Sequence, residues 1–240
     1  MFKSMKAPIL ITGCARSGTS MVAGIINKRG AFGGKMNGAT PNNAKGMFEN
    51  NQIRQEIVKP YLVSIGVDKM GQYPMPDALK LDPVTSWKGS VENVMKEEGY
   101  VEGPWMYKGA KMCQHWPIWN HAFPNAKWII VRRKTSDIIN SCLRTGFMSA
   151  FVRPGNQKKV GAENEWDAWL WWVHQHEARF IEMIQAGLNC KVIWPERMVD
   201  GDYSQIKEML EWLGLEWGSE VTDFIEPKLW KSRWLSQKTK

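Results

Sequence analysis

The fold is decided by the stretch Pro8-Ile-Leu-Ile-Thr12-Gly13-Cys-Ala-Arg16-Ser17-Gly18-Thr19-Ser20. Its opening run is short, rich in β-branched residues and closed by a glycine, which predicts a buried strand. The apolar spacing from Met21 to Lys28 then predicts a helix. A glycine-bracketed turn between a strand and a helix directs several backbone N–H groups, and the positive end of the helix, at one point. The sequence therefore predicts an anion-binding loop here. The alternative interpretation is a turn that merely needs glycine.

Side chains of this loop add to the predicted anion site. Gly18 lets the backbone approach a ligand, and further donors come from Arg16, Ser17, Thr19 and Ser20. A loop for ATP or GTP would read G-x-x-x-x-G-K-[ST]. Thr19 stands where that lysine belongs, and the cation has moved to Arg16. Nucleoside-triphosphate chemistry is therefore disfavoured.

The rest of the chain alternates predicted strands and helices. Further strands are predicted at 105–108, 127–131 and 191–194, and helices at 51–65, 137–143, 165–186 and 204–213. This alternation favours an α/β fold with a central parallel sheet flanked by helices. We expect one domain over residues 1–240. Residues 66–90 look irregular because of their glycines and prolines, and we expect 66–104 to be an insertion near a substrate cleft.

Composition narrows the possible partners. The chain carries 32 Lys and Arg against 24 Asp and Glu, a formal charge of +8 that suits an anionic ligand. The basic residues are scattered, and their longest cluster is Arg132-Arg133-Lys134, so nucleic acid is disfavoured. Four widely separated cysteines predict free thiols in a reducing compartment rather than a zinc site. No segment has the length of a signal peptide or a membrane span, so we expect a cytoplasmic protein.

A second anion site is predicted just after the strand at 127–131. Arg133 follows this strand, and Ser141 comes eight residues later on the next predicted helix. A forked guanidinium and a hydroxyl in this arrangement can converge on one anion. The alternative is that Arg133 forms only an i,i+4 surface pair with Asp137.

The two sites together resemble those of the sulfotransferases that use 3′-phosphoadenosine-5′-phosphosulfate (PAPS), above all carbohydrate and bacterial-type members. The resemblance rests on Arg16-Ser-Gly-Thr-Ser20 after the first strand and on the segment from Phe123 to Ser141. It implies a P-loop NTPase-like three-layer fold, with the 5′-phosphate and sulfonate in the first loop and the 3′-phosphate at Arg133 and Ser141. PAPS is then the sulfuryl donor, adenosine 3′,5′-bisphosphate is the product, and no metal is expected.

The resemblance also suggests a leaving-group cation. Lys108, at the end of a predicted strand, is similar to the family's lysine in K-x-P-R, although Gly109-Ala110-Lys111 follows here and the proline is missing. An ordinary lysine at a strand end is the alternative interpretation. Relatives often bring a basic loop to the nucleotide, and Lys228, Lys231 and Arg233 lie where it would be, although a solvated tail is the simpler interpretation.

Two residues are candidates for the general base. Glu49 follows Gly46-Met-Phe48, a pattern that resembles carbohydrate and bacterial-type members in which the glutamate is the base. We expect its apolar neighbours to raise its pKa by desolvation. Its alternative role is to cap the next helix. His115 is the second candidate, although its spacing from Lys108 departs from the Lys-x-His that is usual in other branches of the family.

Other interpretations stay open. A P-loop small-molecule kinase would need ATP and Mg²⁺, and a non-catalytic protein could keep the nucleotide pocket and bind a partner through 66–104. The tryptophan-rich helix at 165–186 places Trp166 and Trp169 on one face with Val173, which predicts core packing rather than a sugar platform. The acceptor, a hydroxyl or amine of a small molecule, lipid or carbohydrate, and the oligomeric state are not fixed by the sequence.

Overall fold

The computed structural model describes residues 5–230, which contain a four-stranded sheet in the order β2-β1-β3-β4. The strands are β1 (Ile9–Gly13), β2 (Met106–Lys108), β3 (Lys127–Val131) and β4 (Cys190–Ile193). All three strand pairs are parallel. The prediction of an α/β fold around a parallel sheet is confirmed, and each predicted strand lies within a residue or two of its observed bounds.

Helices and short helical turns connect the strands. In chain order they are α1 (Thr19–Lys28), the π-helical η1 (Ile53–Val58), α2 (Lys59–Ser64), η2 (Ala78–Lys80), α3 (Trp87–Glu97), η3 (Ala110–His115), α4 (Trp116–Ala122), α5 (Thr135–Thr145), η4 (Phe147–Ser149), α6 (Pro154–Lys158), α7 (Glu165–Gln185), α8 (Pro195–Val199), α9 (Ser204–Leu213), α10 (Ser219–Phe224) and η5 (Pro227–Leu229).

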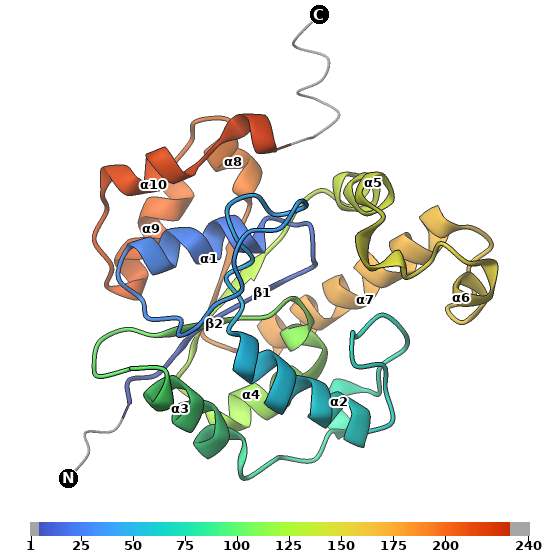
Figure 1. Ribbon diagram of the computed structural model, residues 1–240, viewed down its shortest axis with the longest axis horizontal. Helices are drawn as coiled ribbons and strands as arrows, with labels where there is room; N and C mark the ends of the chain where they lie inside the picture. The colour runs from blue at the N-terminus through green and yellow to red at the C-terminus, as the bar shows by residue number, and fades with distance from the viewer. Residues whose placement is uncertain (1–4, 231–240) are drawn as a thin grey trace, which may run out of the picture.

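Helices cover both faces of the sheet. Successive residues of a strand point to opposite faces, so each strand packs against both layers of helices. Leu10 and Trp128 pack with α3, α4 and the end of α7. Ile11 and Ile129 pack on the other side with α1, α9 and α10. Figure 1 shows α1, α9 and α10 gathered on one side of the strands and α2, α3 and α4 on the other. These two apolar layers hold the sheet and fix the positions of its strand ends.

Most predicted helices are confirmed. The helix at 204–213 has the predicted bounds, and Gly214 ends it with a φ of 75°, a conformation that favours glycine. Trp169 on α7 is buried in the core, as expected. The same expectation for Trp166 is wrong, since 41% of it is exposed. Trp166 lies in the first turn of α7, ahead of the helical stretch that packs against α5.

Residues 66–104 combine loop and core helix. The segment up to Ser86 is mostly irregular, as predicted, and Met70 from it lines the cavity described below. The α3 helix within the same range packs Trp87, Val91 and Met95 into the core beside the sheet. The structure thus makes part of this segment a structural layer of the fold.

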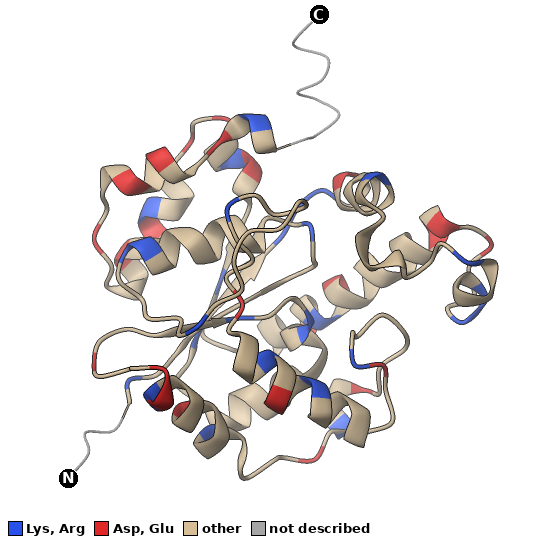
Figure 2. Cartoon of the chain, in the orientation of Figure 1, with Lys and Arg blue, Asp and Glu red and all other residues tan. Residues whose placement is uncertain are grey.

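The order of the strands creates a site at one end of the sheet. From β1 the chain passes to β2 on one side and later returns to β3 on the other, so the strand order reverses between β1 and β3. In parallel α/β sheets, ligands bind beyond the carboxyl ends of the strands at such a reversal. Lys and Arg occur on several of the loops around these strand ends (Figure 2). Within residues 5–230, we find no helix that is both long and apolar enough to cross a bilayer.

Candidate anion-binding and catalytic site

The loop after β1 is built for close approach of its backbone. A Cβ added to Gly13 would overlap the Val131 carbonyl oxygen and lie 2.7 Å from Thr19 Cγ2, so only glycine fits between β1, β3 and α1. Gly18 has a φ of 99°, and Arg16 also has a positive φ, of 71°. This tightly wound turn brings the chain directly from the end of β1 into α1.

The N-terminus of α1 is available to an anion. Within the described part of the chain, no side chain caps it and its first turn contains no acidic residue. The first N–H groups of a helix have no partner inside the helix, and they carry its positive end. Gly18, Thr19 and Ser20 line the cavity at this point. The Ser17 hydroxyl is buried beneath the loop without a hydrogen-bond partner among residues 5–230, and Ser17 is not among the cavity-lining residues.

The two predicted anion sites adjoin each other. Arg16 Nε donates to Ser141 Oγ at 3.0 Å, and Arg133 Nη1 donates to the Arg16 carbonyl at 3.1 Å. These contacts span 125 and 117 residues of sequence, so they depend on β1 and β3 lying side by side. Arg16 and Arg133 both line the cavity. Ser141 is not among the lining residues, but it accepts the hydrogen bond from Arg16. The first loop and the Arg133/Ser141 pair therefore form one continuous surface.

Arg133 is held in place from several sides. Its guanidinium lies 3.9 Å from the ring centroid of Trp230, and its Nε lies 3.9 Å from Glu196 Oε1. Arg133 is 5% exposed and Asp137 is 8% exposed, so the interpretation of these two as a surface pair is wrong. Trp230 also lies over Gly18, where an added Cβ would come within 2.9 Å of its ring.

Lys108 and Glu49 form a buried ion pair beside this surface. Lys108 ends β2 next to Ile11 of β1, and its Nζ lies 2.9 Å from Glu49 Oε1. Arg54 Nε lies 3.2 Å from the other oxygen, Glu49 Oε2. Glu49 does not cap the following helical turn, since Asn50 Oδ1 accepts from the Ile53 N–H instead. Glu49 instead pairs with Lys108 and Arg54 and lines the cavity.

The expected rise in the pKa of Glu49 is wrong. Burial by itself raises the pKa of this carboxyl, but the nearby cations Lys108 and Arg54 outweigh burial and hold its pKa below the usual value. Glu49 is therefore ionised at neutral pH, and its oxygens are acceptors.

His115 lies away from these groups. Its Nε2 accepts a hydrogen bond from Trp119 Nε1 at 3.1 Å, and its ring packs against Tyr61 and Trp87. Its exposed fraction is 0%, and it is not among the residues that line the cavity. Burial, with a smaller contribution from Lys111, lowers the pKa of His115 to about 3. This geometry argues against His115 as the base, because a substrate in the cavity cannot reach it.

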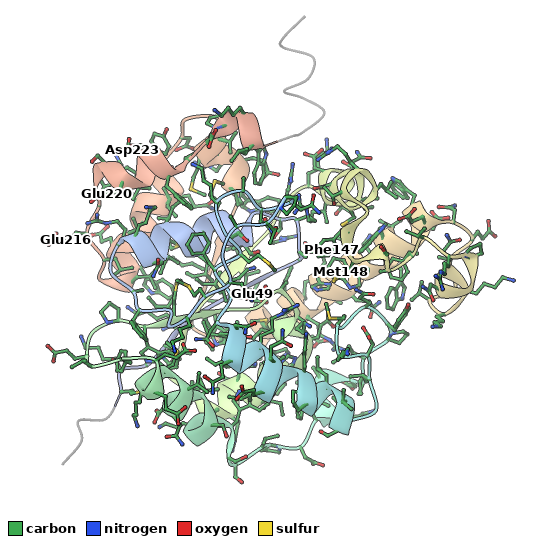
Figure 3. All side chains as sticks on the ribbon, in the orientation of Figure 1. Glu49, Phe147, Met148, Glu216, Glu220 and Asp223 are labelled. Carbon is green, nitrogen blue, oxygen red and sulfur yellow. The ribbon has the colours of Figure 1, made fainter. Side chains whose placement is uncertain are left out.

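A single cavity of about 420 Å³ connects the anion surface with the ion pair. Its volume falls in the range of small-molecule sites. Figure 3 places Glu49 near the centre of the molecule, with Phe147 and Met148 to one side below α5. Its lining includes the charged residues Arg16, Glu49, Arg54, Lys108, Lys111 and Arg133.

Sequence reasoning missed two of the residues at this site. Arg54 lies five residues beyond Glu49 on η1, a spacing without a motif, and its role depends on the π-helical turn. Trp230 reaches Arg133 and Gly18 from the C-terminal part of the chain. Of the basic residues named in that part, Lys228 pairs with Glu226 at 2.8 Å, and Lys231 and Arg233 lie outside the described residues.

The fold and the cavity together define a class of protein. A glycine-bracketed loop at the strand-order reversal of a parallel sheet, facing a second arginine after the neighbouring strand, characterises α/β proteins of the P-loop-like fold that bind anionic ligands. Within this class, the model of the sulfotransferase family matches residues 8–219, and the chain belongs to that family. Membership supports an enzyme that transfers sulfate.

Solved structures agree with this assignment of the fold. Sulfotransferase STF9 from Mycobacterium avium aligns with a TM-score of 0.57 at 11% identity, over 99% of this chain and 70% of that one. The sulfotransferase domain of the Synechococcus PCC 7002 olefin synthase gives 0.55 at 12% identity, over 98% and 84% of the two chains. The sulfotransferase domain from the curacin biosynthetic pathway gives 0.53 at 15% identity, over 93% and 79%. A search of curated protein sequences found no match.

Proposed function

We propose that this protein transfers the sulfuryl group of PAPS to a hydroxyl or amine of an acceptor. The observation that carries the proposal is the position of the Lys108–Glu49 pair in the same cavity as the Arg16–Arg133 surface. One part of the cavity offers donors to phosphates, and the other offers a carboxylate that can take a proton.

The residues present fit the anionic groups of PAPS. Two guanidiniums, Arg16 and Arg133, stand beside the uncapped N-terminus of α1. Guanidinium groups and helix N-termini are the preferred partners of phosphates. In the family resemblance, the loop from Arg16 to Ser20 holds the 5′-phosphosulfate, and Arg133 with Ser141 holds the 3′-phosphate. Since Arg16 bonds Ser141 directly, one side chain links the two halves of this anion surface.

The chain's own residues can supply both proton transfer and charge stabilisation. PAPS would bring the sulfuryl group as co-substrate. Glu49, ionised at neutral pH, accepts the proton of the acceptor's hydroxyl or amine as the acceptor atom bonds to sulfur. The bond from sulfur to the bridging oxygen breaks, and its electron pair stays on the leaving phosphate. The Lys108 ammonium can donate to that oxygen, so adenosine 3′,5′-bisphosphate departs with its charge compensated.

The ion pair keeps the side chains of Lys108 and Glu49 oriented before the substrates bind. Lys108 is 4% exposed and Glu49 is 8% exposed, so each is shielded from water and oriented by the other. Arg54 binds the second oxygen of Glu49, so the carboxylate keeps its position when Lys108 turns to the leaving group. Preorganised charges of this kind lower the energy needed to rearrange the site during the reaction.

A thermal-shift comparison tests the proposed function. We expect adenosine 3′,5′-bisphosphate to stabilise the protein without any metal, by about 2.7 kcal/mol at a concentration a hundred times its Kd. Labelled sulfonate should then pass from PAPS to a component of a host-cell extract. Stabilisation by ATP with Mg²⁺ alone would instead identify a kinase. Binding of the bisphosphate without any transfer would identify a non-catalytic nucleotide-binding protein.

A further inference from the structure

A second group of cations lies next to Glu49, separate from the anion surface of Arg16 and Arg133. Arg54 and Lys111 line the cavity there, and Lys59 stands close behind them. The charged groups that act on Lys111 are Arg54, Glu49, Lys59 and Asp68. Arg144, at the end of α5, acts on both Arg16 and Arg133, and Arg16 also acts on Arg133. The two basic groups lie on different segments of the chain, since Arg16 and Arg133 follow β1 and β3, whereas Arg54 lies on η1 and Lys111 on η3.

The cations near Glu49 outnumber the acids. Glu49 is shared between Lys108 and Arg54. Lys111 Nζ donates to the Lys69 carbonyl at 2.9 Å and, within residues 5–230, has no carboxylate within ion-pair distance. The carboxylate of Asp68 accepts the N–H groups of its own loop, from Met70 at 3.1 Å and Gln72 at 3.0 Å. Within residues 5–230, the carboxylate of Glu49 is thus shared by Lys108 and Arg54, and Lys111 makes no direct ion pair.

This arrangement is unfavourable in the protein alone. Burial, and then the repulsion of Arg54, lowers the pKa of the Lys111 ammonium to about 8. Within residues 5–230, the side-chain nitrogens of Arg54 donate no hydrogen bond, and the shortest contact of its guanidinium with Glu49 is through Nε. A negatively charged group placed between Arg54 and Lys111 would relieve this repulsion and fill those donors.

The same part of the cavity has an apolar wall. Val58 lies four residues after Arg54 on η1, and Met70 follows the residue whose carbonyl binds Lys111. Trp172 Nε1 donates to the Gly71 carbonyl at 3.1 Å, so its ring is fixed beside the same loop. Val58, Met70 and Trp172 all line the cavity. This part of the cavity thus combines the fixed indole ring of Trp172 and the apolar side chains of Val58 and Met70 with the two cations Arg54 and Lys111.

A π-helical turn presents this surface. The η1 helix is π-helical, a rare form that is frequent at functional sites. Arg54 and Val58 on this wide turn both line the cavity. The side chain of Asn50 fixes the start of the turn, because its Oδ1 accepts a hydrogen bond from the Ile53 N–H at 2.9 Å. The turn therefore positions a cation and an apolar contact together next to the carboxylate of Glu49.

We propose that the acceptor carries an anionic group, a carboxylate, phosphate or similar oxyanion, beside an apolar ring or chain, with Arg54 and Lys111 binding the anion and Val58, Met70 and Trp172 binding the apolar part. This inference rests on the proposed function, because it names the class of acceptor whose hydroxyl or amine meets Glu49. Arg54 contacts both the proposed anion and the base, so the anion lies close to the group that is sulfated.

Matched probes test the inference. The probes are 4-hydroxyphenylacetate, its neutral methyl ester and 4-hydroxybenzylphosphonate. Binding of each is measured by calorimetry to protein saturated with adenosine 3′,5′-bisphosphate, and sulfonate transfer from PAPS is measured alongside. We expect the two anions to bind at least about tenfold more tightly than the ester, the effect of one charge-assisted hydrogen bond. Preference for the carboxylate or for the phosphonate tells which oxyanion the site takes.

A pair of lysine variants supplies the control. Lys111→Met should remove the preference for the anions and raise their KM about tenfold, whereas the KM of the neutral methyl ester and the binding of the bisphosphate should change far less. Lys88→Met, on the exposed face of α3 and paired with Glu92, should behave as wild type. Equal binding of acid and ester, or no binding of any probe, would overturn the inference about the acceptor. Failure of adenosine 3′,5′-bisphosphate to bind would instead overturn the proposed function.

Discussion

Lys108 donates to Glu49 at 2.9 Å across 59 residues of sequence, and this pair is buried in the same cavity as Arg16 and Arg133. An isolated buried carboxylate or ammonium is strongly disfavoured, so each needs the other in the folded protein. The pair also supplies the two opposite charges that sulfuryl transfer needs at its two ends. Its stability and its proposed chemistry therefore depend on the same contact.

Replacing Glu49 tests the proposed base. Glu49→Gln keeps the shape of the side chain but cannot take a proton, so we expect transfer to fall by roughly 10²- to 10⁴-fold. Binding of adenosine 3′,5′-bisphosphate, followed by thermal shift, should be retained. Glu56→Gln, an exposed change on the following η1 turn, serves as the control. Full turnover in Glu49→Gln would remove Glu49 from the mechanism.

His115 should contribute to stability and not to turnover. His115→Gln retains an acceptor for the Trp119 N–H, and we expect kcat to stay within about twofold of wild type. In the fold His115 has a pKa of about 3, whereas its ordinary value is 6.5. Between these values the unfolded chain binds more protons, so the free energy of unfolding falls as pH drops through this window.

Chemical denaturation at several pH values measures this effect. The decrease in stability from pH 6.5 downward should be shallower in His115→Gln than in wild type. If His115→Gln folds and binds the bisphosphate but has lost turnover, His115 is again a candidate for the general base.

Arg133 should recognise the 3′-phosphate. Arg133→Met removes a buried guanidinium from the anion surface, and we expect the affinity for adenosine 3′,5′-bisphosphate to fall about 10- to 100-fold. The affinity for adenosine 5′-phosphate, which lacks the 3′-phosphate, should change far less. Calorimetry with both nucleotides measures the difference. Arg132→Met is the matched control, since Arg132 faces Trp194 and Glu177 and does not line the cavity.

Gly13 should tolerate no side chain. In Gly13→Ala the new methyl group would overlap the Val131 carbonyl oxygen and press on Thr19, so β1, β3 and α1 would have to separate. We expect a loss of stability of about 1–3 kcal/mol, measured by urea unfolding. Gly89→Ala provides the contrast, because Gly89 lies in α3 with open space at its Cβ. Alanine there should stabilise the helix by about 0.5–1 kcal/mol. Equal stabilities of the two variants would show that the β1 loop is not tightly packed.

Lys111 should make acceptor binding depend on pH. Its pKa of about 8 arises from burial and the cations Arg54 and Lys59, against the attraction of Glu49 and Asp68. As pH rises through 8 the ammonium loses its proton, so the KM of an anionic acceptor should increase. The KM of the matched methyl ester should stay constant over the same range. Steady-state kinetics from pH 7 to pH 9 measure both, and parallel curves for the two acceptors would contradict a role for Lys111.

The sequence by itself determined the local elements and the anion loop. The run Ile9–Gly13 followed by a glycine turn and a helix needs only neighbouring residues, because strand and helix periodicity and the steric freedom of glycine act over a few positions. The sulfotransferase family could be named from Arg16 to Ser20 and from Arg133 to Ser141 for the same reason, and the family match confirms it.

Only the tertiary structure decided which charges meet. The Glu49–Lys108 contact and the packing of His115 against Tyr61 and Trp87 join residues far apart in sequence. The Glu49–Arg54 contact joins near neighbours but depends on the π-helical turn of η1. Electrostatic energy depends on the distances between charged groups and on their burial away from water. Neither quantity can be predicted from the local sequence. The apolar residues next to Glu49 in the sequence predicted a raised pKa, whereas the cations around Glu49 in the folded protein, Lys108 above all, hold its pKa below the usual value.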